Sequence, residues 1–263
     1  MNYTEGLFRF IEKSPTPFHV IDNMKQELEE QGYKQLLERE EWKLEHGGKY
    51  YVIRNGSAMV AFRVPEGTFS GFQIVASHSD APCLKLKENP ELWSEQAYVR
   101  LNVEKYGGMI CSTWFDRPLS VAGRLLVKSE EGVTVKLVQI DKDLLMLPSL
   151  AIHMNRDINT GYDYHAQKDM LPLYGMGTKG EKESFMDRIA READVKKEDI
   201  LGSDLYVYNR MQGSVWGSED EFISIGKLDD LECVYSSMTS FLSAEEQDRI
   251  PVHCVYDNED RKS

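Results

Sequence analysis

The sequence predicts an α/β domain that is interrupted by a mostly β insertion. Three observations support this prediction. Helix-like periodicity and an apolar, strand-like run occur near both ends of the chain, and the middle is rich in short strands. The 263 residues with 41% apolar content are enough for one large domain or two moderate ones. The simplest division gives residues 1–92 and 224–263 to the α/β domain and residues 93–223 to the insertion.

The N-terminal part of the chain carries clear local signals. Thr16-Pro17 predicts a helix start, because a capping hydroxyl precedes a proline at the first helical position. Gly32 is expected to end this helix. Asn55-Gly56 lies between two β-rich runs and predicts a hairpin. The run "GFQIVAS" at 71–77 is expected to be a strand that is buried on both faces of a sheet.

The middle of the chain has a different character. It contains strand-like runs with short turns, which favours an antiparallel or barrel-like arrangement, and "EKESFMDRIARE" at 181–192 predicts one short helix. Residues 153–182 are polar and irregular. From Leu228 onward, apolar residues recur at alternating steps of three and four, which indicates one face of a helix. Residues 250–256 are expected to form a last strand. The predicted strands of the middle segment are 97–108, 119–129, 132–140, 204–209 and 221–226.

Composition excludes several functional classes. The formal net charge of −13 argues against nucleic-acid binding, which needs a net basic face. The chain has no apolar run of 18 residues, so no membrane span is expected, and its first residues lack the pattern of a signal peptide. The four cysteines are scattered without a CxxC pair, which indicates reduced thiols in a cytoplasmic protein and no zinc-thiolate site.

Three polar clusters lie at the ends of predicted elements. His78-Ser79-Asp80 follows one apolar strand, Asp229-Asp230 opens the later helix, and the acidic run 257–260 follows the last strand. Sites in open α/β sheets form outside the carboxyl ends of the strands, where the first and third clusters lie. Asp229 is expected in the first helical turn, where the helix dipole favours an anion.

These residue types suit hydrolysis with metal assistance. A neutral imidazole with several carboxylates fits zinc or another divalent ion, and Asp80 has the right spacing to orient a ligating His78. A free glutamate can deprotonate a bound water and pass the proton to a leaving amine. Each cluster alone has a simpler explanation: a polar turn, a helix cap or a solvated acidic turn. Their shared placement at element ends favours a site.

Six stretches in order along the chain carry a more specific signal. They are "SPTPFHV" at 14–20, "ASHSDAPCLKLK" at 76–87, "WFDRPLSVAGRLLVK" at 114–128, "LPSLAIHMNRDIN" at 147–159, "GKLDDLECVYSSMTSFL" at 226–242 and "VYDNED" at 255–260. With these stretches the sequence closely resembles the M18 metallopeptidases, the aspartyl aminopeptidase family. The resemblance implies a di-zinc aminopeptidase with an α/β catalytic domain, an inserted β-rich dimerisation domain, and assembly into shells that are commonly dodecamers.

The resemblance also assigns roles to residues. It implies that His78 is a metal ligand oriented by Asp80, that Asp229 bridges two zinc ions, and that Asp260 takes the place of a glutamate ligand. The family usually has Glu-Glu, an apolar residue and Gly-Ser where this chain has Glu-Asp-Arg-Lys-Ser at 259–263.

Two further roles and one limitation follow from the resemblance. Glu259 looks like the general base, and His153 looks like the histidine that reaches a neighbouring subunit's site and steadies the reacting carbonyl. Members of the family continue well beyond residue 263 and hold further ligands there. We therefore expect this chain to be an incomplete copy that is inactive alone. Peptide substrates are the expected partners, with acidic Asp or Glu residues removed from the N-terminus.

Two other interpretations stay open at this stage. The first is a non-catalytic, truncated paralogue that acts only as an assembly or binding subunit. The second is a related di-zinc peptidase of the M42 type, against which the "WFDRPLS" and "AIHMNRD" stretches count.

Overall fold

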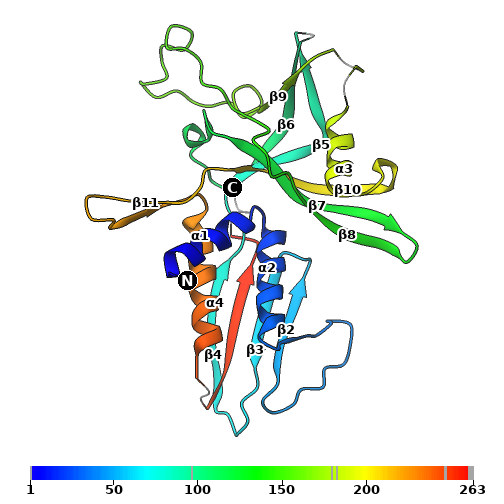
Figure 1. The fold of residues 1–263 in the computed structure, drawn as a ribbon, viewed down its shortest axis with the longest axis vertical. Coiled ribbons are helices and arrows are strands. Elements are labelled where there is room, and N and C mark those ends of the chain that lie inside the picture. Colours follow the sequence, from blue (N-terminus) through cyan, green and yellow to red (C-terminus); the bar gives the residue numbers. More distant parts are fainter. Residues whose placement is uncertain (1, 96, 179, 182, 246–247, 260–263) are drawn as a thin grey trace. The chain divides into compact units, whose positions relative to one another are not determined.

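The computed structural model describes residues 2–95, 97–178, 180–181, 183–245 and 248–259. The described residues divide into two compact units, one formed by residues 2–81 and 212–259 and one formed by Pro82–Met211 (Figure 1). The mixed α/β fold class is as predicted. Each described helix falls short of the length and apolarity that crossing a membrane requires.

The first unit is a five-stranded sheet with helices. Its strands lie in the order β1-β2-β3-β13-β4, with β4 at the edge. β13 runs parallel to β4 and antiparallel to β3. Its elements are α1 (Tyr3–Lys13), α2 (Pro17–Glu30), β1 (Lys34–Gln35), β2 (Lys49–Arg54), β3 (Ala58–Arg63), β4 (Gly71–His78), β11 (Ser214–Trp216), β12 (Phe222–Ser224), α4 (Leu228–Ser243) and β13 (Arg249–Tyr256).

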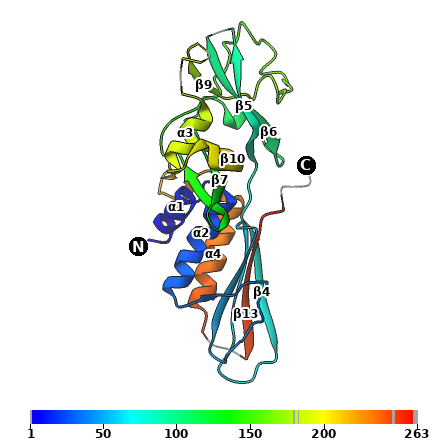
Figure 2. The ribbon, with the colours of Figure 1, turned by 90° about the vertical axis from the view of Figure 1, so that its right-hand side faces the viewer.

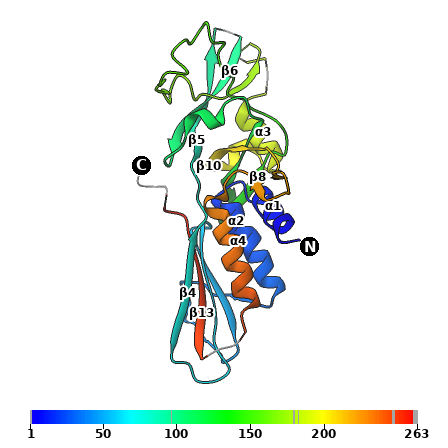
Figure 3. The ribbon, with the colours of Figure 1, turned by 90° about the vertical axis from the view of Figure 1, so that its left-hand side faces the viewer.

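The helices of this unit lie on one side of the sheet. Figures 2 and 3 show α1, α2 and α4 together on one face of the strands. The core forms between them, where apolar side chains of the three helices meet Tyr51, Met59 and Val255 from the sheet. Because side chains alternate along a strand, the neighbouring residues of β13, β3 and β2 point to the opposite face.

The local signals in this part of the sequence are borne out, with one difference. α2 begins at Pro17 and ends at Glu30, as predicted. The Thr16 hydroxyl does not cap the helix backbone, but instead contacts Nδ1 of His19 at 2.8 Å. The hairpin joins β2 and β3, and both Asn55 (φ 54°) and Gly56 (φ 71°) adopt the left-handed backbone that its turn requires.

The prediction that the run at 71–77 is buried on both faces is wrong. In the described part of the chain β4 pairs with one strand only, β13, so it lies at the edge of the sheet. Phe72 is 61% exposed and Ile74 64% exposed. The sequence of a strand shows that it is apolar. Its burial depends on which other elements lie beside and above it, and these are distant in the sequence.

The second unit is built around a six-stranded sheet in the order β8-β7-β10-β5-β6-β9, in which all pairs are antiparallel. Phe185 and Ile189 of its helix are fully buried in the unit's core. Its elements are β5 (Cys83–Ser94), β6 (Tyr98–Tyr106), β7 (Leu119–Ser129), β8 (Gly132–Gln139), β9 (Leu173–Met176), α3 (Phe185–Glu192) and β10 (Ile200–Asn209), with short 3-10 helices at Cys111–Trp114 and Lys197–Asp199.

The division between the units falls earlier in the sequence than the predicted boundaries at 93 and 223. β5 is a continuous strand from Cys83 to Ser94, so a boundary at 93 would cut it near its end. The β11–β12 hairpin, which ends at Ser224, belongs to the first unit. The dimerisation role of the inserted unit stays a prediction.

A buried histidine on β13 predicts acid-sensitive stability. His253 is 1% exposed and contacts the Ser237 hydroxyl through Nε2 at 2.8 Å. Burial lowers the pKa of this imidazole from 6.5 to about 4, so between these values the unfolded chain binds a proton that the folded chain does not. The contribution of neutral His253 to the free energy of unfolding is complete above pH 6.5. It is lost as the pH falls toward 4, at up to about 1.4 kcal/mol per pH unit.

We expect His253→Phe, which keeps an aromatic ring beside Phe241, to reduce the loss of stability between pH 6.5 and 4.5 in urea unfolding. The exposed His165→Phe serves as the control and should leave the pH dependence unchanged. An equal pH dependence in the wild-type chain and His253→Phe would contradict the assignment.

Candidate metal centre

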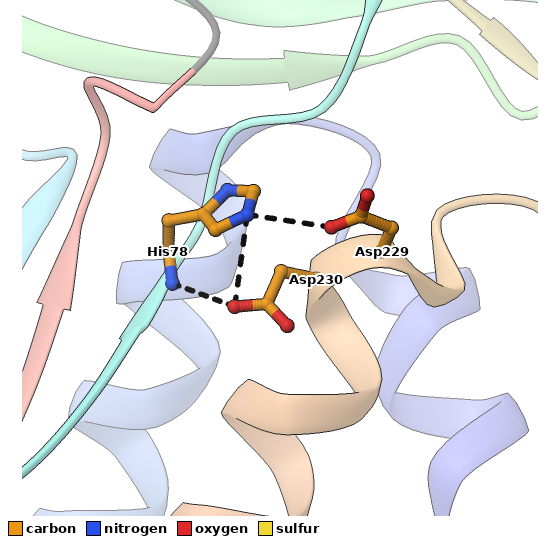
Figure 4. Close-up of side chains that lie close together, drawn as sticks. All are labelled: His78, Asp229 and Asp230. Atoms are coloured by element: carbon orange, nitrogen blue, oxygen red, sulfur yellow. Dashed lines mark hydrogen bonds and ion pairs between the residues drawn. The ribbon is translucent and has the colours of Figure 1, made fainter.

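One group of potential metal ligands stands out among the described residues. His78 lies at the end of β4, and Asp229 and Asp230 lie at the start of α4. Their ligand atoms all lie within 4.8 Å of one another (Figure 4). The cluster contains residues from two of the three predicted polar segments. His78 and Asp230 are 152 residues apart in the sequence.

The two ring nitrogens of His78 have different surroundings. Nδ1 lies 3.0 Å from the backbone oxygen of Asp80 and 3.3 Å from its Oδ1. Asp80 is fully buried. Nε2 faces the opposite way, 3.4 Å from Oδ1 of Asp229 and 3.7 Å from Oδ2 of Asp230. A neutral imidazole that donates through Nδ1 to Asp80 presents a lone pair at Nε2, which is the form that binds a metal.

Asp230 belongs to one of the three predicted polar clusters, but no role in the site was predicted for it. Its Oδ2 accepts the backbone N–H of His78 at 3.0 Å, so it fixes the strand end as well as facing the imidazole. Its side chain is 14% exposed, against 91% for Asp229. The two carboxylates therefore differ in role: one is held in place, and the other is open to solvent. The only sequence signal for Asp230 was its position beside another aspartate.

The start of α4 is irregular where the two aspartates lie. Asp229 (φ −83°, ψ 111°) and Asp230 (φ −117°, ψ 19°) do not have helical backbone angles, and a cis peptide bond joins them. Asp229 therefore lies in the first turn of α4, as expected, but its backbone is not helical there. The non-helical backbone places both carboxylates on the side of His78, whereas neighbouring residues of a regular helix point about 100° apart.

A lysine anchors this irregular segment. Lys227 adopts a left-handed backbone (φ 60°, ψ 29°), and its Nζ donates to the backbone oxygen of Ser14 at 2.6 Å. Ser14 follows the last turn of α1, where the unpaired carbonyls of a helix favour a cation. Asn23 donates to the Ser14 hydroxyl at 3.0 Å. Ser14, at the junction between α1 and α2, thus fixes the position of Lys227, two residues before Asp229.

Two other titratable groups lie near these segments. Burial, with the nearby Lys227 charge as a second cause, lowers the pKa of His19 to about 4 and keeps this ring neutral. A hydrogen bond with Asp230 is the main cause that raises the pKa of the Cys233 thiol to about 12, followed by burial and the charges of Asp230 and Glu232. Cys233 therefore stays protonated at neutral pH.

The remaining predicted site residues lie outside the cluster. Glu259 is exposed and follows β13, whose last residue Tyr256 pairs in register with His78. The carboxyl ends of β4 and β13 therefore lie side by side. His153 is exposed in an irregular part of the second unit. Asp260, the predicted third metal ligand, lies outside the described residues.

Comparisons with known proteins agree with this fold. The profile of the family described as "Aminopeptidase I zinc metalloprotease (M18)" matches residues 10–263. A relative from Clostridium novyi, "Probable M18 family aminopeptidase 2", is 43% identical over 99% of this chain and 61% of its own length. The chain belongs to the M18 peptidase family.

Solved structures give the same result. The structure of Chaetomium thermophilum mApe1 is similar with a TM-score of 0.90 at 31% identity, over 98% of this chain and 62% of that one. The S. cerevisiae mApe1 dodecamer is similar with a TM-score of 0.80 at 27% identity, over 97% of this chain and 60% of that one. The α/β fold is thus of the M18 zinc-peptidase type, and the chain spans about three-fifths of the length of these relatives.

The Lys227 anchor predicts a stability effect that depends on one hydrogen bond. Lys227→Met keeps the side-chain length and the left-handed backbone requirement but removes the charged donor to Ser14. We expect a loss of about 1.5–3 kcal/mol in the free energy of urea unfolding, which is typical of a hydrogen bond to a charged group. The exposed Lys43→Met is the matched control, and a loss of the same size in both variants would contradict the anchor.

Proposed function

We propose that this chain forms part of a zinc-dependent aminopeptidase that removes N-terminal residues, preferably Asp or Glu, from peptides. Membership of the M18 family supports the zinc-dependent aminopeptidase activity. The preference for acidic residues rests on the resemblance to the aspartyl aminopeptidases. Because the chain spans about three-fifths of its relatives, the activity is assigned to the whole protein that contains it.

One observation carries the proposal. Nδ1 of His78 is occupied by Asp80, and Nε2 is directed toward the carboxylates of Asp229 and Asp230. One imidazole nitrogen and carboxylate oxygens are a donor set that zinc accepts. The residues present therefore fit a metal, and in an aminopeptidase a bound zinc ion polarises the substrate carbonyl and activates the attacking water.

The proposed ligands have distinct roles. His78 and Asp229 would hold the metal, with Asp229 as the shared ligand if two zinc ions bind. Its 91% exposed side chain, with one oxygen toward Nε2, is open to a second partner. Asp260 completes the set in the proposal as a further ligand. Asp80 acts through His78, because its contact with Nδ1 fixes the tautomer and orientation of the ring.

Two residues are proposed to act on the substrate. The Glu259 carboxylate takes a proton from the attacking water and delivers it to the leaving amine. The strand register that places the ends of β4 and β13 together supports this role. His153, from the inserted unit of a neighbouring subunit, is proposed to donate a hydrogen bond to the reacting carbonyl.

The proposal includes an assembled, cytoplasmic protein. The similar S. cerevisiae structure is described as a dodecamer, which supports self-association through the inserted unit from a dimer upward. None of the four cysteines is joined in a disulfide, which supports a reducing compartment.

The metal site can be tested on the chain as it is. We expect the purified chain to bind Zn²⁺ in equilibrium dialysis, and His78→Ala to weaken the binding by at least about 10-fold because the only imidazole of the cluster is lost. His165→Ala, which removes an exposed histidine elsewhere, is the control. Equal zinc affinity in the wild-type chain and His78→Ala would exclude the proposed centre.

If Glu259 is the general base, its substitution should abolish activity without removing zinc. Two zinc ions need about four ligands each, which the cluster does not supply, so we expect no appreciable hydrolysis of an aspartyl or glutamyl amide by this chain alone. In an active preparation that contains the whole catalytic unit, Glu259→Gln should lower kcat by about 100-fold or more and keep zinc.

Two results would count against this assignment. Loss of zinc in Glu259→Gln would make this residue a ligand. Chelator-sensitive hydrolysis by the 263-residue chain alone would show that its own residues complete the site. A zinc-free, inactive but assembled protein would favour the non-catalytic subunit instead.

A further inference from the structure

The "WFDRPLS" stretch at 114–120 lies in the second unit and begins with a turn of uncommon backbone geometry. A short 3-10 helix ends at Trp114, Phe115 is extended, and Asp116 adopts a left-handed backbone with φ 56°. Residues other than glycine rarely adopt this conformation, although aspartate and asparagine tolerate it best. Such a backbone persists where surrounding contacts hold it, so the contacts of Asp116 indicate what the turn supports.

Asp116 holds the start of the loop that carries His153. Its backbone N–H donates to the oxygen of Leu147 at 2.9 Å, and its Oδ1 accepts the backbone N–H of Ser149 at 2.8 Å. Leu147 is fully buried, so the first bond ties the loop to the core of the unit. The two bonds lie on either side of Pro148, whose fixed φ limits the backbone freedom between them.

Phe115 holds the other end of the same loop. Its ring packs on the ring of Tyr164 with 5.1 Å between the centroids, and both rings lie against the core of the second unit. Tyr164 in turn contacts the ring of Tyr162 edge-on at 5.1 Å. Oδ2 of Asp169 accepts the Tyr162 hydroxyl at 3.1 Å. Two consecutive side chains therefore hold both ends of the segment 149–164.

The tip of this loop is exposed. Leu150, Ile152 and Met154 are 61%, 55% and 68% exposed, so they do not pack into the core. The backbone N–H of Met154 donates to the oxygen of Ala151 at 2.8 Å, which forms a turn around the exposed His153. The position of His153 therefore depends on where the two ends of the loop are anchored.

We propose that Phe115 and Asp116 are positioning residues, which clamp the loop 149–164 and thereby set where His153 is presented. This inference rests on the proposed role of His153 at the substrate carbonyl. A group that acts on the reacting atoms must be held to within about 0.5 Å of its productive position. A residue far from the chemistry lowers the rate when its loss shifts such a group.

A purely local role for Asp116 is the alternative. In that case its carboxylate only completes the turn at 114–120, and its loss affects the stability of the unit without a specific effect on His153. The chain path favours the clamp, because Ser149, which Asp116 holds, lies only four positions before His153.

The clamp can be tested on this chain by amide hydrogen exchange followed by NMR. Asp116→Ala removes the acceptor, and we expect the amides of Ser149 and Met154 to exchange at least about threefold faster. Asp116→Asn keeps an acceptor oxygen and tolerates the left-handed backbone, so it should keep most of the protection. Asp194→Ala is the matched control, because Asp194 is also an exposed aspartate of this unit with a left-handed backbone (φ 52°).

The exit of the loop is tested in the same way. Phe115→Leu keeps an apolar side chain but removes the ring contact with Tyr164. We expect at least about threefold faster exchange of the His165 amide, which donates to Oδ2 of Asp169 at 2.7 Å. The amides of β7 should keep their protection in every variant, which shows that the unit remains folded.

Kinetics show whether the clamp acts through His153. In an active preparation that contains the whole catalytic unit, Asp116→Ala should lower kcat about 10-fold and change KM less, because a misplaced His153 loses a contact made in the transition state. Asp116→Asn should keep most of kcat. The double variant of Asp116→Ala and His153→Ala should lose no more activity than His153→Ala alone.

Two results would overturn the inference. They are unchanged exchange of the loop amides in Asp116→Ala and Phe115→Leu, and losses of kcat that multiply in the double variant. A separate result tests the proposed function. If His153→Ala leaves kcat unchanged while the loop exchanges faster in Asp116→Ala, the clamp on the loop is supported and the catalytic role of His153 is overturned.

Discussion

The hydrogen bond from the His78 backbone N–H to the Asp230 carboxylate is the contact on which the candidate site depends. It joins the end of β4 to the start of α4, two segments 152 residues apart in sequence. With this bond in place, the imidazole lies between a buried carboxylate on one side and two carboxylates on the other. A part-buried charged acceptor holds its donor more firmly than an exposed one. Asp230 therefore fixes where the metal-facing nitrogen points, and Asp229 is left open to solvent.

The supporting structure extends this constraint to the N-terminal helices. Lys227 ties the residues before Asp229 to the α1–α2 junction, and Asn23 ties the same junction to α2. The irregular backbone at Asp229 and Asp230 is thus held from both sides: by the lysine before it, and by the regular part of α4 after it. A site built in this way needs the helix layer of the first unit as much as the sheet.

Features encoded by neighbouring residues could be predicted from the sequence, and features created by distant residues could not. The hairpin at Asn55-Gly56 and the helix that starts at Pro17 depend on local backbone preferences, so both were predicted correctly. The left-handed Lys227 and the role of Asp230 arise from partners far away in sequence, which no local pattern reports. The exposure of Phe72 and Ile74 follows from the position of β4 at the edge of the sheet. His78 and Asp229 came together as expected because residue type and position at element ends agreed. The roles of Glu259 and His153 stay predictions.

The position of β13 has a consequence for how the chain acquires its structure during synthesis. This strand lies between β3 and β4, although it is the last described strand to leave the ribosome. The inserted unit is contiguous from Pro82 to Met211, so all of its strands are available before residue 249 is made. Sequential synthesis therefore favours early folding of the inserted unit, while β3 and β4 wait for the strand that separates them. Until then, apolar strand edges stay open, which is the condition under which folding intermediates aggregate.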